Sequence, residues 1–273
     1  METIEHIIPY KSRAEEFHIY PIGDIHAGVK HCDEEAIRNQ IKLIKNDTHG
    51  YWVGMGDYAD LITRFDSRWD IDVMSEWVEK SNIAESQRRW LVELFKPIKS
   101  KCLGLLYGNH EESCRLFNSQ DIHLNLCRDL EVPNLGFSCF VSLIFKRLTG
   151  KNDSTVSSFL KIICRFEHGS GAAQSDGGKM NRLKQGMYAF EGDIYGMGHL
   201  HDIKIDKMPY LYLGNNKKIR ERLKVGAITG SWFRAYRQGI RASYAERKGY
   251  RPTPVGCPMF VIKPDKARVD VRS

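Results

Sequence analysis

The sequence predicts an α/β fold, on three observations. Short apolar runs that end in or next to glycine alternate with helical patterns through the first half of the chain, at residues 17–23, 51–56 and 102–107. Such alternation is typical of strands joined by helices in a mostly parallel sheet. Polar side chains follow each run, where the carboxyl ends of such strands place their ligands. The composition agrees, because 42% hydrophobic and 27% charged residues are ordinary for a globular protein with a substantial core.

The helices of the first half are indicated by periodicity and by stop signals. They are predicted over residues 33–46, 75–97 and about 119–130. Ile37, Ile41 and Ile44 recur at helical spacing in the first, and Pro97 ends the second. The third strand therefore leads through Asn109 and His110 before its helix begins.

The second half is predicted to be richer in strands. Its apolar runs, bounded by turn residues, fall at 137–146, 158–166, 193–198, 203–213, 223–229 and 257–272. Residues 172–190 combine a Gly/Asp/Ser turn with a weakly apolar stretch, and the pattern assigns them no element. No internal repeat or low-complexity linker divides the chain, so a single domain over residues 1–273 is expected.

Other features of the sequence narrow the cellular setting. No run approaches the roughly 18 apolar residues of a membrane span, and residues 1–16 are too charged for a secretory signal. Seven cysteines are scattered without a Cys-x-x-Cys pair, which is typical of reduced thiols. A cytoplasmic protein without membrane contact is expected, and its oligomeric state is left open.

Candidate functional residues directly follow the apolar runs. In the stretch from Leu105 to Glu111, for example, Gly108 ends the run and ligand-type side chains come next. The full set comprises Asp24, His26, Asp57, Asn109, His168, His199 and His201. Each has an ordinary structural explanation, since aspartates cap helices and Gly-Asp forms turns. Their recurrence after five predicted strand ends favours a shared site instead.

The donor types in this set indicate a metal centre. Carboxylate, amide and imidazole donors without thiolates suit manganese, iron, zinc or cobalt better than calcium or a structural cysteine-type zinc site. Seven ligands are too many for one ion, so two divalent ions are expected. Manganese is the first choice, with iron, zinc, cobalt or nickel as alternatives.

The motifs around these residues resemble those of the calcineurin-like metallophosphoesterase superfamily. In chain order they are Gly23-Asp24-Ile25-His26, Gly56-Asp57-Tyr58-Ala59-Asp60, Gly108-Asn109-His110-Glu111, Glu167-His168-Gly169 and Gly198-His199-Leu200-His201. Their order and rough spacing match the superfamily over about residues 17–205. The resemblance implies a four-layer αββα sandwich of two mixed β-sheets flanked by helices. Residues 60–100 and 206–256 match no motif and are expected to be insertions that shape the cleft.

The resemblance also implies a role for each candidate residue. One metal ion would be held by Asp24, His26 and His201. The other would be held by Asn109, His168 and His199, with Asp57 bridging the two. His110 would be the catalytic acid, and Asp60 would orient it as a carboxylate fixes an imidazole.

The implied reaction is hydrolysis of a phosphoester. Two divalent ions roughly 3.5–4 Å apart lower the pKa of a shared water and clamp the phosphoryl oxygens. The resulting hydroxide would attack phosphorus in line, with His110 protonating the leaving oxygen. No activated serine or cysteine is needed, so no covalent intermediate is expected.

One departure from the superfamily bears on the substrate. Its Ser/Thr protein phosphatases continue Gly-Asp-x-x-Asp with Arg-Gly, whereas Leu61-Ile62 stand here. Without that arginine a phosphodiester monoanion fits better than a monoester dianion, although Arg64, Arg68 or Arg115 could substitute. A phosphodiesterase or nuclease is therefore expected. A phosphomonoesterase is the alternative, and a non-catalytic metal-binding module is a third interpretation.

Basic residues concentrate in one segment of the chain. The net charge is +7, and residues 217–251 alone contain eleven lysines and arginines against two glutamates, with aromatic residues interleaved. Cations neutralise phosphates and rings stack bases, so the segment is predicted to guide a DNA or RNA strand into the cleft. The residues expected to do so are Arg234, Arg237, Arg241, Trp232 and Tyr236. A solvated surface that only aids solubility is the alternative.

Overall fold

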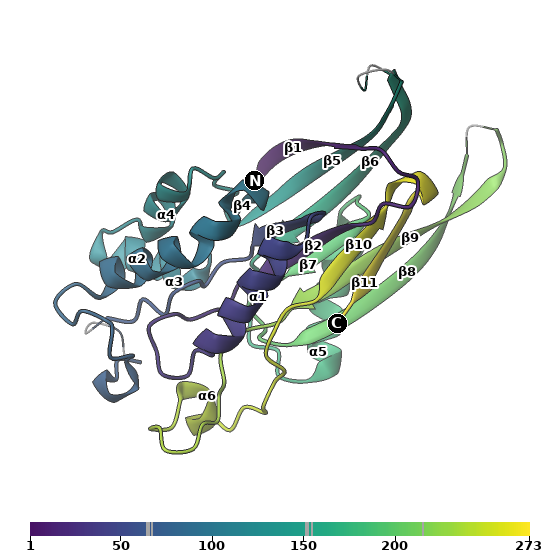
Figure 1. Cartoon of the computed structure of the whole chain (residues 1–273). Coiled ribbons are helices and arrows are strands. Elements are labelled where there is room, and N and C mark those ends of the chain that lie inside the picture. The colour runs from purple at the N-terminus through teal and green to yellow at the C-terminus, as the bar shows by residue number, and fades with distance from the viewer. Residues whose placement is uncertain (64–65, 67, 151–152, 154, 215) are drawn as a thin grey trace.

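Two mixed β-sheets pack face to face and helices cover both outer faces (Figure 1). The computed structural model describes residues 1–63, 66, 68–150, 153, 155–214 and 216–273. The predicted four-layer αββα sandwich of two mixed β-sheets flanked by helices is confirmed.

The first sheet has five strands in the order β11-β10-β2-β3-β4. They are β2 (Phe17–Ile22), β3 (Gly50–Gly54), β4 (Cys102–Leu105), β10 (Met259–Lys263) and β11 (Arg268–Arg272). Strands β2, β3 and β4 are parallel, so their carboxyl ends meet at one edge of the sheet. The loops with the first three motifs leave from that edge.

The second sheet has six strands in the order β1-β5-β6-β7-β9-β8. They are β1 (Glu2–Tyr10), β5 (Ser138–Thr149), β6 (Thr155–Glu167), β7 (Ile194–Met197), β8 (Ile203–Leu213) and β9 (Ile219–Thr229). Strands β6 and β7 are parallel and deliver the last two motifs from their carboxyl ends. Strand β1, which the sequence pattern did not indicate, adds a parallel edge strand along β5.

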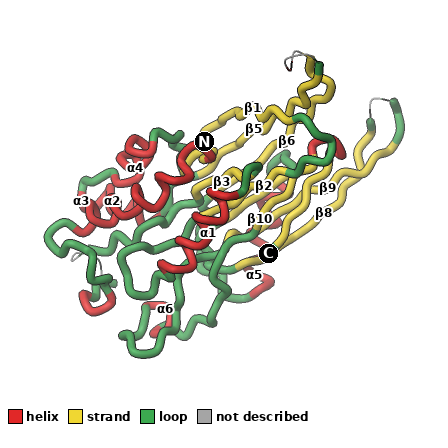
Figure 2. The backbone as a smooth tube through the Cα atoms, in the orientation of Figure 1, coloured by secondary structure: helices red, strands yellow, loops and turns green. Residues whose placement is uncertain are grey.

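The helices form the two outer layers, except for the last and shortest, which has no buried residue (Figure 2). They are α1 (Glu34–Asn46), α2 (Ile83–Phe95), α3 (Asn109–Asn118), α4 (Ile122–Leu130), α5 (Asp176–Ala189) and α6 (Tyr244–Arg247). Short 3-10 helices occur at Ile71–Val73, Lys96–Lys101 and Pro264–Lys266. Helices α1, α2 and α4 pack on the five-stranded sheet, and α5 packs on the six-stranded one.

Strict alternation along the strands builds the core. Trp52 of β3 belongs to the cluster beneath the helices, while its neighbour Val53 belongs to the cluster between the two sheets. Successive side chains of a strand point to opposite faces, so a strand buried on both faces carries apolar residues at every position. The indole nitrogen of Trp52 donates to the carbonyl of Ile98 at 2.9 Å, which satisfies its polar group in the core.

Helix boundaries differ from the predicted ones in three places. Helix α2 begins at Ile83 rather than near residue 75, because residues 75–82 form turns and the N–H of Ser75 donates to the carbonyl of Gly28. Helix α3 begins at Asn109, inside the motif itself, where the pattern placed a loop. Residues 172–190, which were left unassigned, contain α5.

The two expected insertions contribute differently to the fold. Within residues 206–256, strands β8 and β9 belong to the six-stranded sheet, because β9 pairs with β7. Residues 230–256, hereafter the strap segment, follow β9 and lie outside both sheets. Within residues 60–100, α2 joins the helical layer. None of the helices in the described ranges is long and apolar enough to cross a bilayer.

Candidate metal centre

Loops from the carboxyl ends of five strands, two in the six-stranded sheet and three in the five-stranded sheet, meet beside one cavity of about 340 Å³. The candidate residues that line it are His26, Asp57, Asp60, Asn109, His110, His199 and His201. Asp24 and His168 lie beneath them and are buried. The fold therefore brings together the candidate residues that the sequence motifs singled out.

The main chain at this centre adopts an unusual conformation. Five of the seven candidate ligands have positive φ, between 47° and 68°: Asp24, His26, Asp57, His199 and His201. Non-glycine residues rarely occupy this left-handed region, and such strained positions cluster at functional sites. The packed loops hold these residues in conformations that their side chains disfavour.

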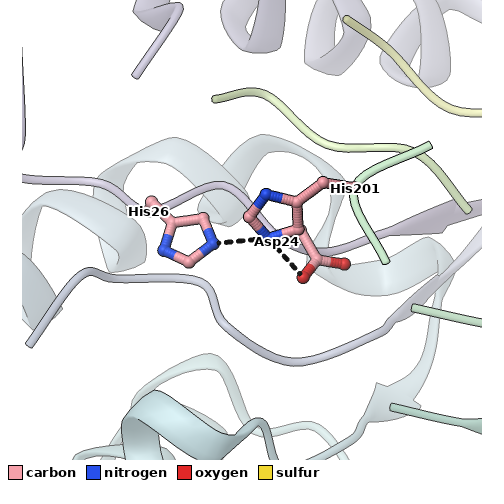
Figure 3. A group of neighbouring side chains, drawn as sticks. All are labelled: Asp24, His26 and His201. Atoms are coloured by element: carbon pink, nitrogen blue, oxygen red, sulfur yellow. Dashed lines mark hydrogen bonds and ion pairs between the residues drawn. The ribbon is translucent and has the colours of Figure 1, made fainter. Parts of the chain in front are cut away.

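The first group of ligands, hereafter the Asp24 group, comprises Asp24, His26 and His201 (Figure 3). The Nε2 atoms of His26 and His201 are 3.0 Å apart, and Nε2 of His201 lies 3.2 Å from Oδ1 of Asp24. The other carboxylate oxygen of Asp24 accepts the main-chain N–H of His199 at 2.9 Å. Asp24 is thus oriented with one oxygen turned toward the two imidazoles.

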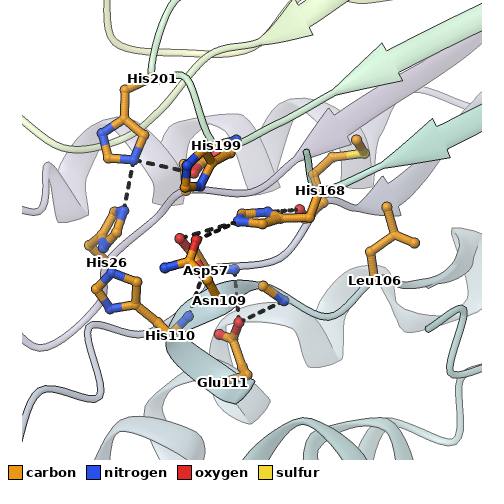
Figure 4. Close-up of polar contacts among 12 residues, drawn as sticks. His26, Asp57, Leu106, Asn109, His110, Glu111, His168, His199 and His201 are labelled. Carbon is orange, nitrogen blue, oxygen red and sulfur yellow. Dashed lines mark hydrogen bonds and ion pairs between the residues drawn. The ribbon is translucent and has the colours of Figure 1, made fainter. Parts of the chain in front are cut away.

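The second group, hereafter the Asp57 group, comprises Asp57, Asn109, His168 and His199 (Figure 4). Nε2 of His168 lies 3.1 Å from Oδ1 of Asn109 and 3.4 Å from Oδ2 of Asp57. His168 Nδ1 donates to the carbonyl of Met55 at 2.7 Å, and His199 Nε2 donates to the carbonyl of Gly171 at 2.9 Å. Each of these rings therefore keeps one nitrogen free for a ligand.

Both groups fit a cation. In the Asp57 group, the acceptors Asn109 Oδ1 and Asp57 Oδ2 converge on a His168 nitrogen whose ring already donates through its other nitrogen. In the Asp24 group, the buried Oδ1 of Asp24 receives no hydrogen bond of good geometry from the described residues. Buried carboxylate and amide oxygens that converge with imidazole nitrogens are a donor set that suits a divalent metal ion. Several of these histidines and aspartates could thus bind metal.

The charges of the Asp57 group are strongly coupled. Burial opposes ionisation of Asp57, but the imidazoles of His168 and His110 outweigh it and hold the Asp57 pKa well below its usual range. Burial likewise opposes a charge on His168, yet the carboxylate of Asp57 dominates and raises the His168 pKa to about 10. In the metal-free protein, a proton on His168 thus occupies the place where the acceptors converge.

His110 is oriented by Asp60 in a different way from the one predicted. The main-chain carbonyl of Asp60, not its carboxylate, accepts from Nδ1 of His110. The carboxylate Oδ1 instead lies 3.6 Å from Nδ1 of His26, so it faces a candidate ligand. Burial disfavours a charge on His110, but the nearby Asp57 and Asp60 outweigh it and raise the His110 pKa above its ordinary value.

Glu111, to which the sequence gave no role, anchors the loop that carries Asp57. Its two carboxylate oxygens accept the main-chain N–H groups of Asp57, Tyr58 and Gly108 at 2.8 to 3.0 Å. Burial, together with the carboxylate of Asp57, raises the Glu111 pKa to about 7. Gly108 allows the close approach, because a Cβ there would lie 2.1 Å from the nitrogen of Asp57. The motif Gly108-Asn109-His110-Glu111 contains this residue, but only the fold shows which main-chain groups it binds.

Of the two substitute arginines that the structure describes, one reaches the cavity. Arg68 lines the cavity wall, with Nη1 3.3 Å from Nε2 of His110, and forms a forked ion pair with Asp66. Arg115 pairs with Glu112 on the surface and is not among the lining residues. Arg64 lies outside the described residues.

The residues predicted to contact nucleic acid do not line the cavity. Trp232 is buried in the helix-side core, so the prediction that it stacks on bases is wrong. Arg234 pairs with Asp33, Arg237 contacts the carbonyls of Lys30 and Cys32, and Arg241 pairs with Asp70 and Asp72. Tyr236 is exposed, and its hydroxyl donates to the carbonyl of Tyr250. These three arginines attach the strap segment to the body of the protein.

The strap segment nevertheless flanks the cavity with other side chains. The lining residues from it are Phe233, Ala235, Tyr244, Ala245, Tyr250, Arg251 and Thr253. Lys179 of α5 also lines the cavity, although it lies far away in the sequence. Nothing in the pattern separates these residues from the other cations and aromatics of the chain.

Comparisons with known proteins give little beyond this geometry. No protein-family model matches the sequence, and no curated protein matches it. Among solved structures, the crystal structure of Chaetomium thermophilum Vps29 matches with a TM-score of 0.35 and 11% sequence identity. The match covers 95% of this chain and 94% of that chain. At so low a similarity, the function has to be argued from the site itself.

Proposed function

We propose that the protein is a divalent-metal-dependent phosphoesterase that hydrolyses phosphodiesters. The observation that carries the proposal is the convergence of seven ligand-type side chains, from five strand-end loops, on one cavity that also contains His110. The order of these loops along the chain is that of the metallophosphoesterases which the motifs resemble. Together the two groups offer enough carboxylate, amide and imidazole donors for two ions, with manganese as the first choice.

When bound, two such ions would lower the pKa of a water and offset the charge that develops on phosphoryl oxygens. The protein's own part is to orient the ligands and to supply a proton. His110 is placed for the proton, because Nδ1 is held by the carbonyl of Asp60 and Nε2 lies at the cavity wall. In the metal-free protein the carboxylates of Asp57 and Asp60 raise its pKa, and once protonated at Nε2 it can donate that proton to a leaving oxygen.

The preference for a diester rests on the charge near His110. Arg68 is the cation recorded beside His110, and its guanidinium is already paired with the carboxylate of Asp66. A neutral pair offsets less substrate charge than a free arginine would, which favours a diester monoanion over a monoester dianion. Release of Arg68 from Asp66 would instead favour a monoester, so phosphomonoesterase activity is the second candidate.

A hydrolysis panel with manganese tests the proposal. It compares bis-p-nitrophenyl phosphate, p-nitrophenyl phosphate, cyclic nucleotides, and single- and double-stranded DNA and RNA. We expect the diester bis-p-nitrophenyl phosphate to be hydrolysed, the activity to disappear with chelator and to return with manganese. Asp57→Asn is the matched control, because it removes one ligand charge and keeps the side-chain shape.

The outcomes separate the candidate functions. Hydrolysis of the monoester alone, lost in Arg68→Gln, would establish a phosphomonoesterase. Metal binding by the wild type, with no substrate cleaved faster than by Asp57→Asn, would leave a non-catalytic metal-binding module. Either result would overturn the phosphodiesterase proposal.

A further inference from the structure

The wall of the cavity formed by α5 and the strap segment is cationic. Lys179 and Arg251 both line the cavity, and both contact Oδ2 of Asp202, at 3.1 and 2.6 Å. Arg251 also pairs with Asp176, which Lys204 contacts at 3.1 Å. Three cations thus share two carboxylates. The cluster therefore retains a net positive charge beside the cavity.

Both lining cations have donors to spare for a ligand. Lysine carries three N–H donors and arginine five. Lys179 is 3% exposed, and within the described chain its ammonium group donates to Asp202. Arg251 uses only Nη2 in its recorded contacts. An ammonium buried at a cavity wall with unused donors is a strong place for an oxyanion.

Aromatic side chains lie next to these cations. Tyr250 precedes Arg251 in the chain and packs edge to face with Tyr244 at a centroid distance of 6.2 Å, and both rings line the cavity. Phe233 lines it as well, 5.6 Å from the ring of His26. Rings beside cations are what a nucleotide requires, because the bases stack while the phosphates are neutralised.

We propose that Lys179 and Arg251 form a second anion subsite, which binds a substrate phosphate that is not hydrolysed. The proposal rests on the proposed function and narrows its substrate to nucleotide chains with at least two phosphates, one at the metal centre and one at this wall. Tyr244 and Tyr250 contact the intervening nucleoside. The competing explanation is structural, namely that Arg251 only attaches the strap segment to α5.

Short thymidine nucleotides distinguish the two explanations. The dinucleotide TpT has a single phosphate, whereas pTpT and TpTp carry a second one on the 5′ or the 3′ side. We expect one of the two-phosphate substrates to be cleaved with a kcat/KM about tenfold or more above that of TpT, the size typical of charge-assisted hydrogen bonds. Arg251→Gln should remove this preference, and Arg251→Lys should restore part of it.

Arg222→Gln provides a matched control. The side chain of Arg222 is 43% exposed and pairs with the buried Asp193, much as Arg251 is 42% exposed and pairs with the buried Asp202. Arg222 does not line the cavity, so its replacement should leave the preference for the second phosphate intact. Equal loss in both variants would indicate a general effect of removing a surface ion pair and would overturn the subsite.

The result also remains separable from the proposed function. If bis-p-nitrophenyl phosphate is hydrolysed but neither added phosphate improves on TpT, the subsite is overturned and the phosphodiesterase stands. If no diester is hydrolysed, calorimetric binding of TpT, pTpT and TpTp decides instead. In that case, tighter binding of a two-phosphate ligand, lost in Arg251→Gln and kept in Arg222→Gln, supports the subsite. Equal affinities overturn it.

Discussion

The two ligand groups of the candidate centre are held with unequal rigidity. In the Asp57 group, both imidazoles have one nitrogen fixed by a main-chain carbonyl, and the side chain of His168 is only 3% exposed. In the Asp24 group, His26 faces the carboxylate of Asp60 at 3.6 Å, and the side chain of His201 is 31% exposed. Pre-oriented ligands lose less freedom on binding. We therefore expect the Asp57 group to bind its ion more tightly.

The largest expected effect comes from Asp57→Asn. The resemblance gives Asp57 to both ions, so the change should remove both and lower activity by more than about 100-fold, since outer partners of ligands alone contribute about 10–100-fold. Elemental analysis and a diester assay measure the two effects. Retention of one ion would mean that Asp57 serves only its own group, and unchanged metal content would refute its role as a ligand.

His110→Ala should lower activity by about 100- to 10,000-fold while both ions stay, as expected for loss of a general acid. His110 contacts both groups, because its main-chain N–H donates to Oδ1 of Asp57 and its ring packs against the ring of His26. A substrate with a very good leaving group should recover most of the loss. Loss of an ion from this variant would show that His110 belongs to one of the two groups as a ligand.

Truncation of one histidine from each group tests their rigidity directly. His168→Ala leaves Asp57 buried without its partner, and should lower the free energy of unfolding of the metal-free protein by about 3–5 kcal/mol. His201→Ala removes a more exposed ring but also leaves the buried Asp24 without its imidazole, so its cost should be smaller, about 1–3 kcal/mol. Urea denaturation in the presence of chelator measures both. Equal losses of unfolding free energy in the two variants would show that the two groups are held equally firmly.

A further expected effect is a pH dependence that arises mainly in the Asp57 group. The His168 pKa is about 10 in the fold, against about 6.5 in an unfolded chain. A raised pKa stabilises the fold fully below the unfolded value, and this contribution is lost as the pH rises through the folded value. Unfolding of the metal-free protein should thus become easier by about 2–4 kcal/mol between these limits. Metal affinity should rise over the same interval, because binding displaces the proton.

Urea denaturation at several pH values, with chelator present, checks this dependence. His168→Ala is the control and should flatten the alkaline decline. A decline of the same size in that variant would assign the effect to another group.

The sequence could single out the candidate ligands because each one follows the end of a strand. Parallel strands place their carboxyl ends together whatever the intervening loops do, so a local pattern was sufficient to group Asp24 with Asp57 in one sheet and His168 with His199 in the other. Helix periodicity likewise located α1 within one residue. Strand β1 was not predicted, because its mixture of charged and apolar residues is typical of an exposed tail. Its pairing with β5 makes it a strand.

The cavity wall could not be predicted from local pattern. Lys179 and Arg251 are far apart in the chain and come together at Asp202. Nothing in the sequence distinguishes them from the many other lysines and arginines. Trp232 is the opposite case: the sequence predicted a binding residue, because an aromatic residue among arginines is typical of a nucleic-acid-binding surface, but the fold buries it. Its main-chain N–H donates to the carbonyl of Asp24 at 3.0 Å, and that anchor turns the ring into the core.

The left-handed main chain at the ligands has a consequence for how such a protein evolves. Each imidazole or carboxylate at positive φ costs roughly 1–2 kcal/mol relative to an unstrained residue, and glycine would relieve that cost. A lineage selected only for thermal stability would drift toward glycine at His199 or His201 and lose the ligands as it did so. The strained main chain and the candidate ligands therefore occupy the same five positions, so relief of the strain by glycine would remove the proposed metal site.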